Sequence, residues 1–171
     1  MKLTRVVNPQ PGDYGLVHGS GFLMALVRWG TRSEYGHARL CVGYGPGDTI
    51  AIVEAQPPGA VTRVLSAWET QVTAWFTVDP TNTQRIAIAN NGRDLVGIGY
   101  GWTDIAALAA WHVLGLRWRW LDRRINREDR LICSQLVALA YARAGIDLIP
   151  DQLPCEDTPA DLAHATPTEE T

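Results

Sequence analysis

The stretch "HARLCVGYGPGDTIAIVEA", residues 37–55, decides the fold because it predicts two antiparallel strands joined by a short turn. Apolar residues alternate with other types over 37–44, which is the two-residue period of a strand with one buried face. The second segment, 49–55, is apolar and β-branched, and the intervening "GPGD" indicates a turn. On the first strand, one face is apolar and the other mixed: Ala38, Leu40 and Val42 against His37, Arg39 and Cys41.

The rest of the chain predicts strands clustered between helices. Further strands are expected at 60–68 and 73–80, and helices at 19–30, 81–92, 103–115, 129–145 and 158–165. Capping residues are expected at Thr81, which has Gln84 at capping-box spacing, and at Thr158. This order favours an α+β fold over an alternating parallel-sheet fold. We expect one domain over residues 1–171, with about 166–171 as a flexible tail.

The composition restricts the classes of partner. With 15 Lys and Arg against 18 Asp and Glu, the formal net charge is −3, which does not favour binding to nucleic acid or to an anionic membrane. No apolar run approaches the roughly 18 residues of a membrane span. The start, "MKLTRVVNPQPGDYG", lacks the apolar segment of a secretory signal. We therefore expect a protein without an integral membrane segment that is cytoplasmic or released without a signal peptide.

Three cysteines, Cys41, Cys133 and Cys155, are an odd number without CxxC spacing, which favours free thiols over a disulfide framework or a zinc site. Cys133 differs from the others because it stands in the first turn of the predicted helix "DRLICSQLVALAYARAG". There, unpaired N–H groups and the helix dipole favour a thiolate. Cys133 also lies on the apolar face of that helix, with Leu136, Val137, Ala140, Tyr141 and Ala144. This pattern alone slightly favours a buried core residue over a nucleophile.

A nucleophilic cysteine needs a base, and four histidines are available. His37 begins the first hairpin strand, so that its ring could stand at a strand edge facing a cleft. Glu54 interrupts the apolar run of the second strand, and two interpretations remain open: it orients the His37 ring, or it ends its strand in solvent. The other histidines occupy weaker positions, in a Gly-rich turn, late in an Ala-rich helix and near the chain end: His18, His112 and His164.

Together, "PGDYGLV", "SEYGHARLCVG", "IVEA" and "ICSQLVALAYARAG" resemble the circularly permuted branch of the NlpC-type, papain-like cysteine hydrolases, the YiiX-like proteins. The resemblance covers roughly 11–55 and 129–163, including the late "TPADLA". It implies a papain-like fold in permuted order, with a small antiparallel sheet packed against the Cys-bearing helix. One departure is "GHARL", where Ala38 and Arg39 stand in place of small or β-branched residues. We expect this departure to alter the wall of the cleft rather than the histidine.

The resemblance assigns roles to the matching residues. Cys133 in "CSQLV" would be the nucleophile, His37 in "YGHARL" the general base and Glu54 in "VEA" the orienting group. Tyr100 in "GIGYGWTD" is the candidate side-chain donor to the oxyanion, together with the backbone N–H of Cys133. The implied chemistry is acyl transfer through a thioester, which requires no metal ion and no organic cofactor.

The expected function is that of a cysteine-dependent acyl hydrolase or transferase, foremost an amidase or peptidase acting on a cell-wall peptide such as a peptidoglycan fragment. A lipid or thioester acyl hydrolase or acyltransferase is one alternative. Another is a catalytically silent module with the same fold, either a binding module that uses the Trp-rich region 102–120 or a structural component of a virion. A bacterial or phage origin fits these expectations.

Overall fold

The computed structural model describes residues 1–19, 24–25, 28–29, 32–101, 130–150, 152 and 157–169. Several expectations from the sequence lie outside the described residues: the helix at 103–115, the Trp-rich region 102–120, His112 and Cys155. Of the helix expected at 19–30, the described residues 24–25 and 28–29 are helical.

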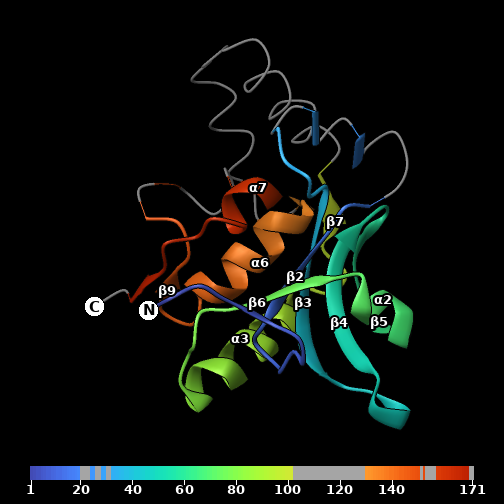
Figure 1. Cartoon of the computed structure of the whole chain (residues 1–171), viewed down its shortest axis with the longest axis horizontal. Coiled ribbons are helices and arrows are strands. Elements are labelled where there is room, and N and C mark those ends of the chain that lie inside the picture. The colour runs from blue at the N-terminus through green and yellow to red at the C-terminus, as the bar shows by residue number, and fades with distance from the viewer. Residues whose placement is uncertain are drawn as a thin grey trace.

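The strands of the described part form one large sheet and one small sheet (Figure 1). In chain order they are β1 (Thr4–Val6), β2 (Tyr14–Val17), β3 (His37–Tyr44), β4 (Ile50–Gln56), β5 (Gly59–Leu65), β6 (Ala74–Thr77), β7 (Gly99–Tyr100), β8 (Arg130–Leu131), β9 (Ile146–Asp147) and β10 (Thr168–Glu169). The large sheet has the order β1-β6-β2-β3-β4-β5-β7-β8, and β10 pairs with β9. Neighbouring strands are antiparallel except β7 and β8, which are parallel. This mostly antiparallel sheet, combined with helices, confirms the predicted α+β class.

The predicted hairpin is confirmed as β3 and β4, which lie side by side within the large sheet. Their register pairs Leu40 with Val53 and Cys41 with Ile52. The connecting turn is a short 3-10 helix, η1 (Pro46–Asp48). Because side chains alternate between the two faces of a strand, this register places His37 and its polar neighbours on one face and the main core on the other.

Helices α6 (Cys133–Ala142) and α3 (Asn82–Asp94) contact each other and β3, so they cover the same region of the sheet (Figure 1). α3 starts at the predicted capping box, in which the hydroxyl of Thr81 accepts the N–H of Gln84 and the Gln84 side chain accepts the N–H of Thr81. The main core fills the space between these helices and the sheet, with buried side chains that include Leu16, Leu40, Val53, Ile88, Leu136, Val137 and Tyr141. The apolar face predicted for the Cys-bearing helix is therefore its buried face.

The second, smaller core contains the buried residues Cys41, Ile50, Ile52, Leu65 and Trp75. The short helix α2 (Ala67–Gln71) follows β5 and contacts it. The strand expected at 60–68 is too long, because β5 ends at Leu65 and a capping box between Ser66 and Glu69 starts α2. This Ser-x-x-Glu spacing was present in the sequence and indicates a helix start.

The C-terminal part of the chain also differs from the expected boundaries. The helix expected at 129–145 begins only at Cys133, because the residues before it form β8 and pair with β7. The short helix α7 (Pro159–Leu162) begins at the predicted cap Thr158. Within the tail expected at 166–171, β10 pairs with β9, so the two backbone segments satisfy each other's hydrogen-bonding groups.

Tyr14 of β2 connects the sheet to both C-terminal helices. Its ring stacks on Phe76 at 5.7 Å between centroids and meets the edge of Tyr141 at 5.9 Å. Its hydroxyl donates to the carbonyl of Leu162 at 2.7 Å, and the hydroxyl of Tyr141 donates to the carbonyl of Gly12. These buried bonds, added to aromatic packing, fix the position of α6 on the sheet.

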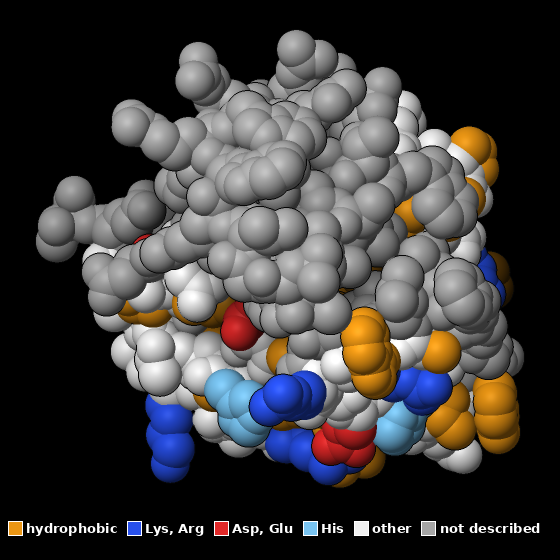
Figure 2. Space-filling view, turned by 90° about the horizontal axis from the view of Figure 1, so that it is seen from above, with side chains coloured by type: hydrophobic (Ala, Val, Ile, Leu, Met, Phe, Trp, Pro, Cys, Tyr) orange, Lys and Arg blue, Asp and Glu red, His pale blue; other side chains and the backbone are white. Residues whose placement is uncertain are grey.

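Among the described residues, no helix combines the length and the apolar character that crossing a membrane would need. Figure 2 shows one face of the molecule, on which basic, acidic and histidine side chains outside the grey region lie close to one another, with hydrophobic side chains between them. The described part of this face therefore presents mixed charge rather than a field of one sign.

Candidate active site

Cys133 is the first residue of α6, which confirms its predicted place in the first helical turn. Its side chain is buried, and its sulfur accepts hydrogen bonds from the backbone N–H groups of Ala38 and Ser134. Such bonds favour the thiolate because they replace part of the hydration that a buried charge loses. The side chain of Gln135 accepts the N–H of Ile132 at 3.1 Å, which caps the turn that presents the thiol.

His37 is the first residue of β3, at the end of the strand that lies nearest to Cys133. Its Nε2 is 2.8 Å from Oε2 of Glu54, which leaves Nδ1 for the thiol. Nδ1 is buried and, within the described residues, has no partner at ordinary hydrogen-bond geometry. The Cys133 side chain nevertheless acts on the ring, both as a charge and as a hydrogen-bonding group. The raised pKa of His37 therefore depends on the Cys133 and Glu54 side chains beside it.

Burial opposes charge on both members of this pair, and their mutual attraction outweighs it. Burial lowers the pKa of His37, but the charge and hydrogen bond of Cys133, followed by Glu54, raise it to about 9. Burial raises the pKa of the Cys133 thiol, but the charge and hydrogen bond of His37 bring it below its ordinary value. The lowered pKa of Cys133 and the raised pKa of His37 both favour a thiolate beside an imidazolium at neutral pH.

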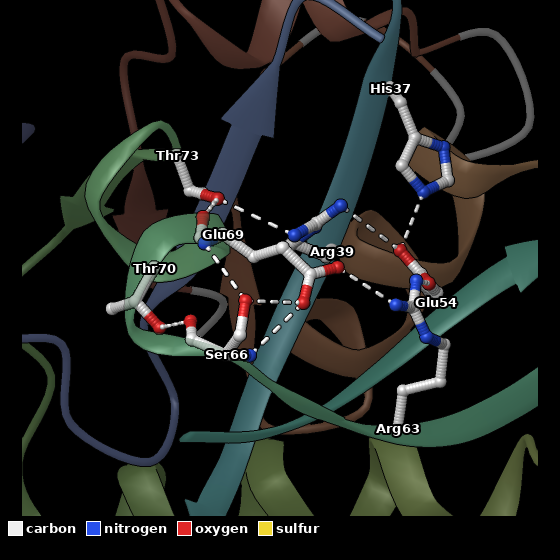
Figure 3. Close-up of polar contacts among 8 residues, drawn as sticks. All are labelled: His37, Arg39, Glu54, Arg63, Ser66, Glu69, Thr70 and Thr73. Carbon is white, nitrogen blue, oxygen red and sulfur yellow. Dashed lines mark hydrogen bonds and ion pairs between the residues drawn. The ribbon is translucent and has the colours of Figure 1, made fainter. Parts of the chain in front are cut away.

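Glu54 is only 1% exposed, and three cationic side chains surround it (Figure 3). His37 and Arg39 approach Oε2 at 2.8 and 3.5 Å, and Arg63 binds Oε1 at 2.7 Å. Burial raises the pKa of this carboxyl group, but the hydrogen bond and charge of His37, together with the arginines, lower it to about 2. Of the two interpretations that the sequence left open for Glu54, the structure therefore supports the buried carboxylate bound to His37.

A second layer of polar groups holds the two arginines (Figure 3). Arg63 also binds Glu69 at 2.8 Å, and Glu69 accepts hydrogen bonds from the backbone and the hydroxyl of Ser66. Arg39 donates to the hydroxyl of Thr73 at 3.4 Å, and that hydroxyl donates to the carbonyl of Glu69 at 2.6 Å. The Glu54 carboxylate is therefore connected, through the two arginines, to Glu69 of α2 and to Thr73 just after that helix.

Sequence reasoning missed the part that Arg39 and Arg63 play. Arg39 was expected to change the wall of a cleft, but it is buried and forms an ion pair with Glu54. The alternation of β3 carried the relevant signal, since it puts Arg39 on the same face as His37. Arg63 gave no such signal, because its position near Glu54 depends on the register in which it pairs with Ile52.

Tyr100 is placed by the strand that pairs with the segment leading into Cys133. It is buried in β7, and its parallel partner in β8 is Leu131, two residues before Cys133. Burial, with a further contribution from the charge of Cys133, raises the pKa of its hydroxyl, which therefore stays protonated and able to donate. Its action as an oxyanion donor remains a prediction.

The other cysteine and histidines of the described part have different surroundings. Cys41 is a free, buried thiol whose pKa burial raises to about 12. His18 is exposed and lies 3.5 Å from Glu34, and His164 lines a surface pocket with Tyr35. Among the described residues, no group of three or more His, Cys, Asp or Glu side chains is arranged to hold a metal ion. Cys133 is thus the cysteine of this part whose surroundings favour a nucleophile.

Compared with protein families and with curated proteins, the chain matches none. The geometry of Cys133, His37 and Glu54 is therefore what indicates a chemistry for this chain. A thiolate can attack an electrophilic carbon, a neighbouring imidazolium can give a proton to a leaving group, and a fixed carboxylate can hold the imidazole in one tautomer.

Proposed function

We propose that this protein is a cysteine-dependent acyl hydrolase or transferase in which Cys133 is the nucleophile, His37 the general acid and base, and Glu54 the group that orients His37. The observation that supports it most is the buried series of contacts from thiol to imidazole to carboxylate, with the pKa of the thiol lowered and that of the imidazole raised. Covalent catalysis uses a nucleophile, a base and an orienting group in this relation. The chain order, with the His-bearing hairpin before the Cys-bearing helix, supports a permuted papain-like fold.

In the first half of the proposed reaction, the Cys133 thiolate attacks the carbonyl carbon of the substrate and forms a carbon–sulfur bond. The carbonyl oxygen becomes an oxyanion, which the backbone N–H of Cys133 and the hydroxyl of Tyr100 stabilise by hydrogen bonds. The His37 imidazolium gives its Nδ1 proton to the leaving group. The bond to the leaving group breaks, and a thioester with Cys133 remains.

In the second half, water or another molecule that accepts the acyl group attacks the thioester carbonyl. The neutral His37 takes a proton from this attacking molecule. The carbon–sulfur bond breaks, the product acid or ester leaves, and the thiolate–imidazolium pair is restored. Glu54 keeps the Nε2–H of His37 in place throughout, so that Nδ1 is the nitrogen that accepts and returns the proton.

The substrate class follows from the resemblance rather than from the site. Peptide amides of the cell-wall type are the leading candidates, and lipid or thioester acyl groups are the alternatives. The protein should therefore be assayed with muropeptide amides, phospholipid esters and acyl thioesters in parallel.

The decisive experiment compares the wild-type chain with Cys133→Ala and with the matched control Cys41→Ala. We expect turnover of at least one substrate class by wild type and by the control, and none by Cys133→Ala. A thiol-alkylating probe near neutral pH, followed by peptide mapping, should modify Cys133 before Cys41. Turnover by a folded Cys133→Ala protein, or equal alkylation of the two cysteines in the native state, would contradict the proposal and favour a catalytically silent module.

A further inference from the structure

We propose that Arg39 and Arg63 are positioning residues for the catalytic pair, and that they act by sharing the Glu54 carboxylate with His37. This inference deepens the proposed function and rests on it. The three cations divide two oxygens between them: His37 and Arg39 approach Oε2, and Arg63 binds Oε1.

The sheet register explains why these side chains meet. Continuing from the pair Leu40–Val53 by one residue, Arg39 stands opposite Glu54 across β3 and β4. On the other side, Arg63 pairs with Ile52 and is therefore diagonal to Glu54 on the same face. The carboxylate is thus held from both neighbouring strands. A carboxylate fixed at both oxygens cannot rotate away from Nε2, so the His37 tautomer is fixed as well.

The sharing also has an electrostatic effect on His37. A buried carboxylate that bound only the imidazolium would make the imidazolium hold its proton strongly, because water does not screen the pair. Two arginines beside the same carboxylate reduce that attraction, so the proton can pass to a leaving group more readily. Among the described residues, Cys133 of α6 and Glu54 of β4 act directly on the charge of His37. Arg39 of β3 and Arg63 of β5 interact with Glu54 and with Glu69 of α2, and Tyr100 of β7 interacts with Cys133.

The two arginines should differ in how strongly each lowers the proton affinity of His37. The Arg39 side chain is 9% exposed and that of Arg63 is 38% exposed, so water screens the charge of Arg63 more. Arg39 also approaches the oxygen that His37 uses, whereas Arg63 binds the other one. Arg39 should therefore have the larger effect on the proton affinity of His37.

The test is an NMR titration of the His37 imidazole in protein labelled at histidine, with the His37 signals assigned by their absence from a His37→Gln variant. Arg39→Met removes the charge at similar length, and we expect it to raise the pKa of His37 by about one pH unit. Arg63→Met should raise it by less. Arg39→Lys restores the charge and should return the pKa most of the way to the wild-type value.

A merely structural role for the arginines predicts a different result: a smaller folded fraction with an unchanged His37 titration. An unchanged or lowered pKa of His37 in folded Arg39→Met would overturn the inference. Should Arg39→Met fail to fold, Arg63→Met decides in its place, because the Arg63 side chain is partly exposed and its loss should be tolerated. An unchanged pKa of His37 in Arg63→Met would then overturn the inference equally. Alkylation of wild-type Cys133 tests the proposed function separately, since failure of that reaction contradicts the catalytic role without depending on either arginine.

Discussion

The imidazole of His37 and the carboxylate of Glu54 meet at 2.8 Å across two neighbouring strands, with side-chain exposures of 8% and 1%. Because water is excluded from both partners, each strongly affects the charge of the other. The contact depends on the register of the hairpin, since a slip of one residue would turn one of the two side chains to the opposite face. The backbone pairing of β3 and β4 is therefore the feature that aligns the base.

Replacing Cys133 by alanine should abolish acyl turnover while leaving the fold intact. The substitution removes one buried sulfur and keeps good helix propensity, so the free energy of unfolding should fall by only about 1 kcal/mol. Urea unfolding and a turnover assay on the same preparation measure the two effects. Cys41→Ala also removes a buried sulfur, from the second, smaller core, and it should lose comparable stability and retain activity. Equal loss of activity in both variants would show that stability alone was responsible.

The pH dependence of kcat/KM should have an alkaline limit near pH 9. The pKa of His37 is raised to about 9, so the imidazolium that protonates the leaving group is present below this pH and lost above it. On the acid side, activity should fall as the thiolate of Cys133 takes up a proton, below the ordinary pKa of a cysteine. A profile measured from pH 4 to 11 tests both limits. An alkaline limit near pH 6.5, the value of an ordinary histidine, would contradict the interaction.

Glu54→Gln should remove a specific part of the acid sensitivity of folding. The pKa of Glu54 is lowered from 4.5 to about 2, so its contribution to stability is complete above pH 4.5 and is lost as pH falls from there toward 2. A shift of this size corresponds to roughly 3 kcal/mol. Urea midpoints measured between pH 2 and 6 should therefore decline less steeply in Glu54→Gln than in wild type.

At neutral pH the same variant leaves the buried Arg39 without its anion, which should cost about 3–5 kcal/mol. Glu34→Gln, which removes an exposed carboxylate, is the matched control for the substitution itself. Parallel slopes in Glu54→Gln and wild type would be incompatible with a buried, ionised Glu54.

Tyr100→Phe should lower kcat by about 100-fold if the hydroxyl donates to the oxyanion, since one such donor typically contributes this much. The rate at which an alkylating reagent modifies Cys133 should remain unchanged, because that reaction forms no oxyanion. Tyr44→Phe, at an exposed tyrosine, is the control for the loss of a hydroxyl. Normal turnover by Tyr100→Phe would leave the backbone N–H of Cys133 as the donor.

Local pattern was sufficient for the elements whose signals are contained in a few adjacent residues. The alternation over 37–44 predicted β3, and the apolar, β-branched run over 49–55 predicted β4. The capping box at Thr81 predicted the start of α3, and the pattern around Cys133 predicted its place in a helical turn. The pairing of β7 with β8 was not predictable, because it joins segments far apart in the sequence. The sharing of Glu54 by two arginines was missed for a different reason: it depends on the registers of three consecutive strands, which the pattern of a single strand does not specify.

The distance along the chain between base and nucleophile determines when the thiol becomes reactive during synthesis. His37 and Glu54 belong to a local hairpin in the first third of the sequence, whereas Cys133 lies in the last quarter. Two of the groups that lower the pKa of Cys133, the His37 ring and the N–H of Ala38, reach it only when α6 has docked on β3. A nascent or unfolded chain therefore carries an ordinary thiol, which is less open to oxidation and unwanted acylation. Nucleophilic character is acquired together with the native state and is lost again when the helix leaves the sheet.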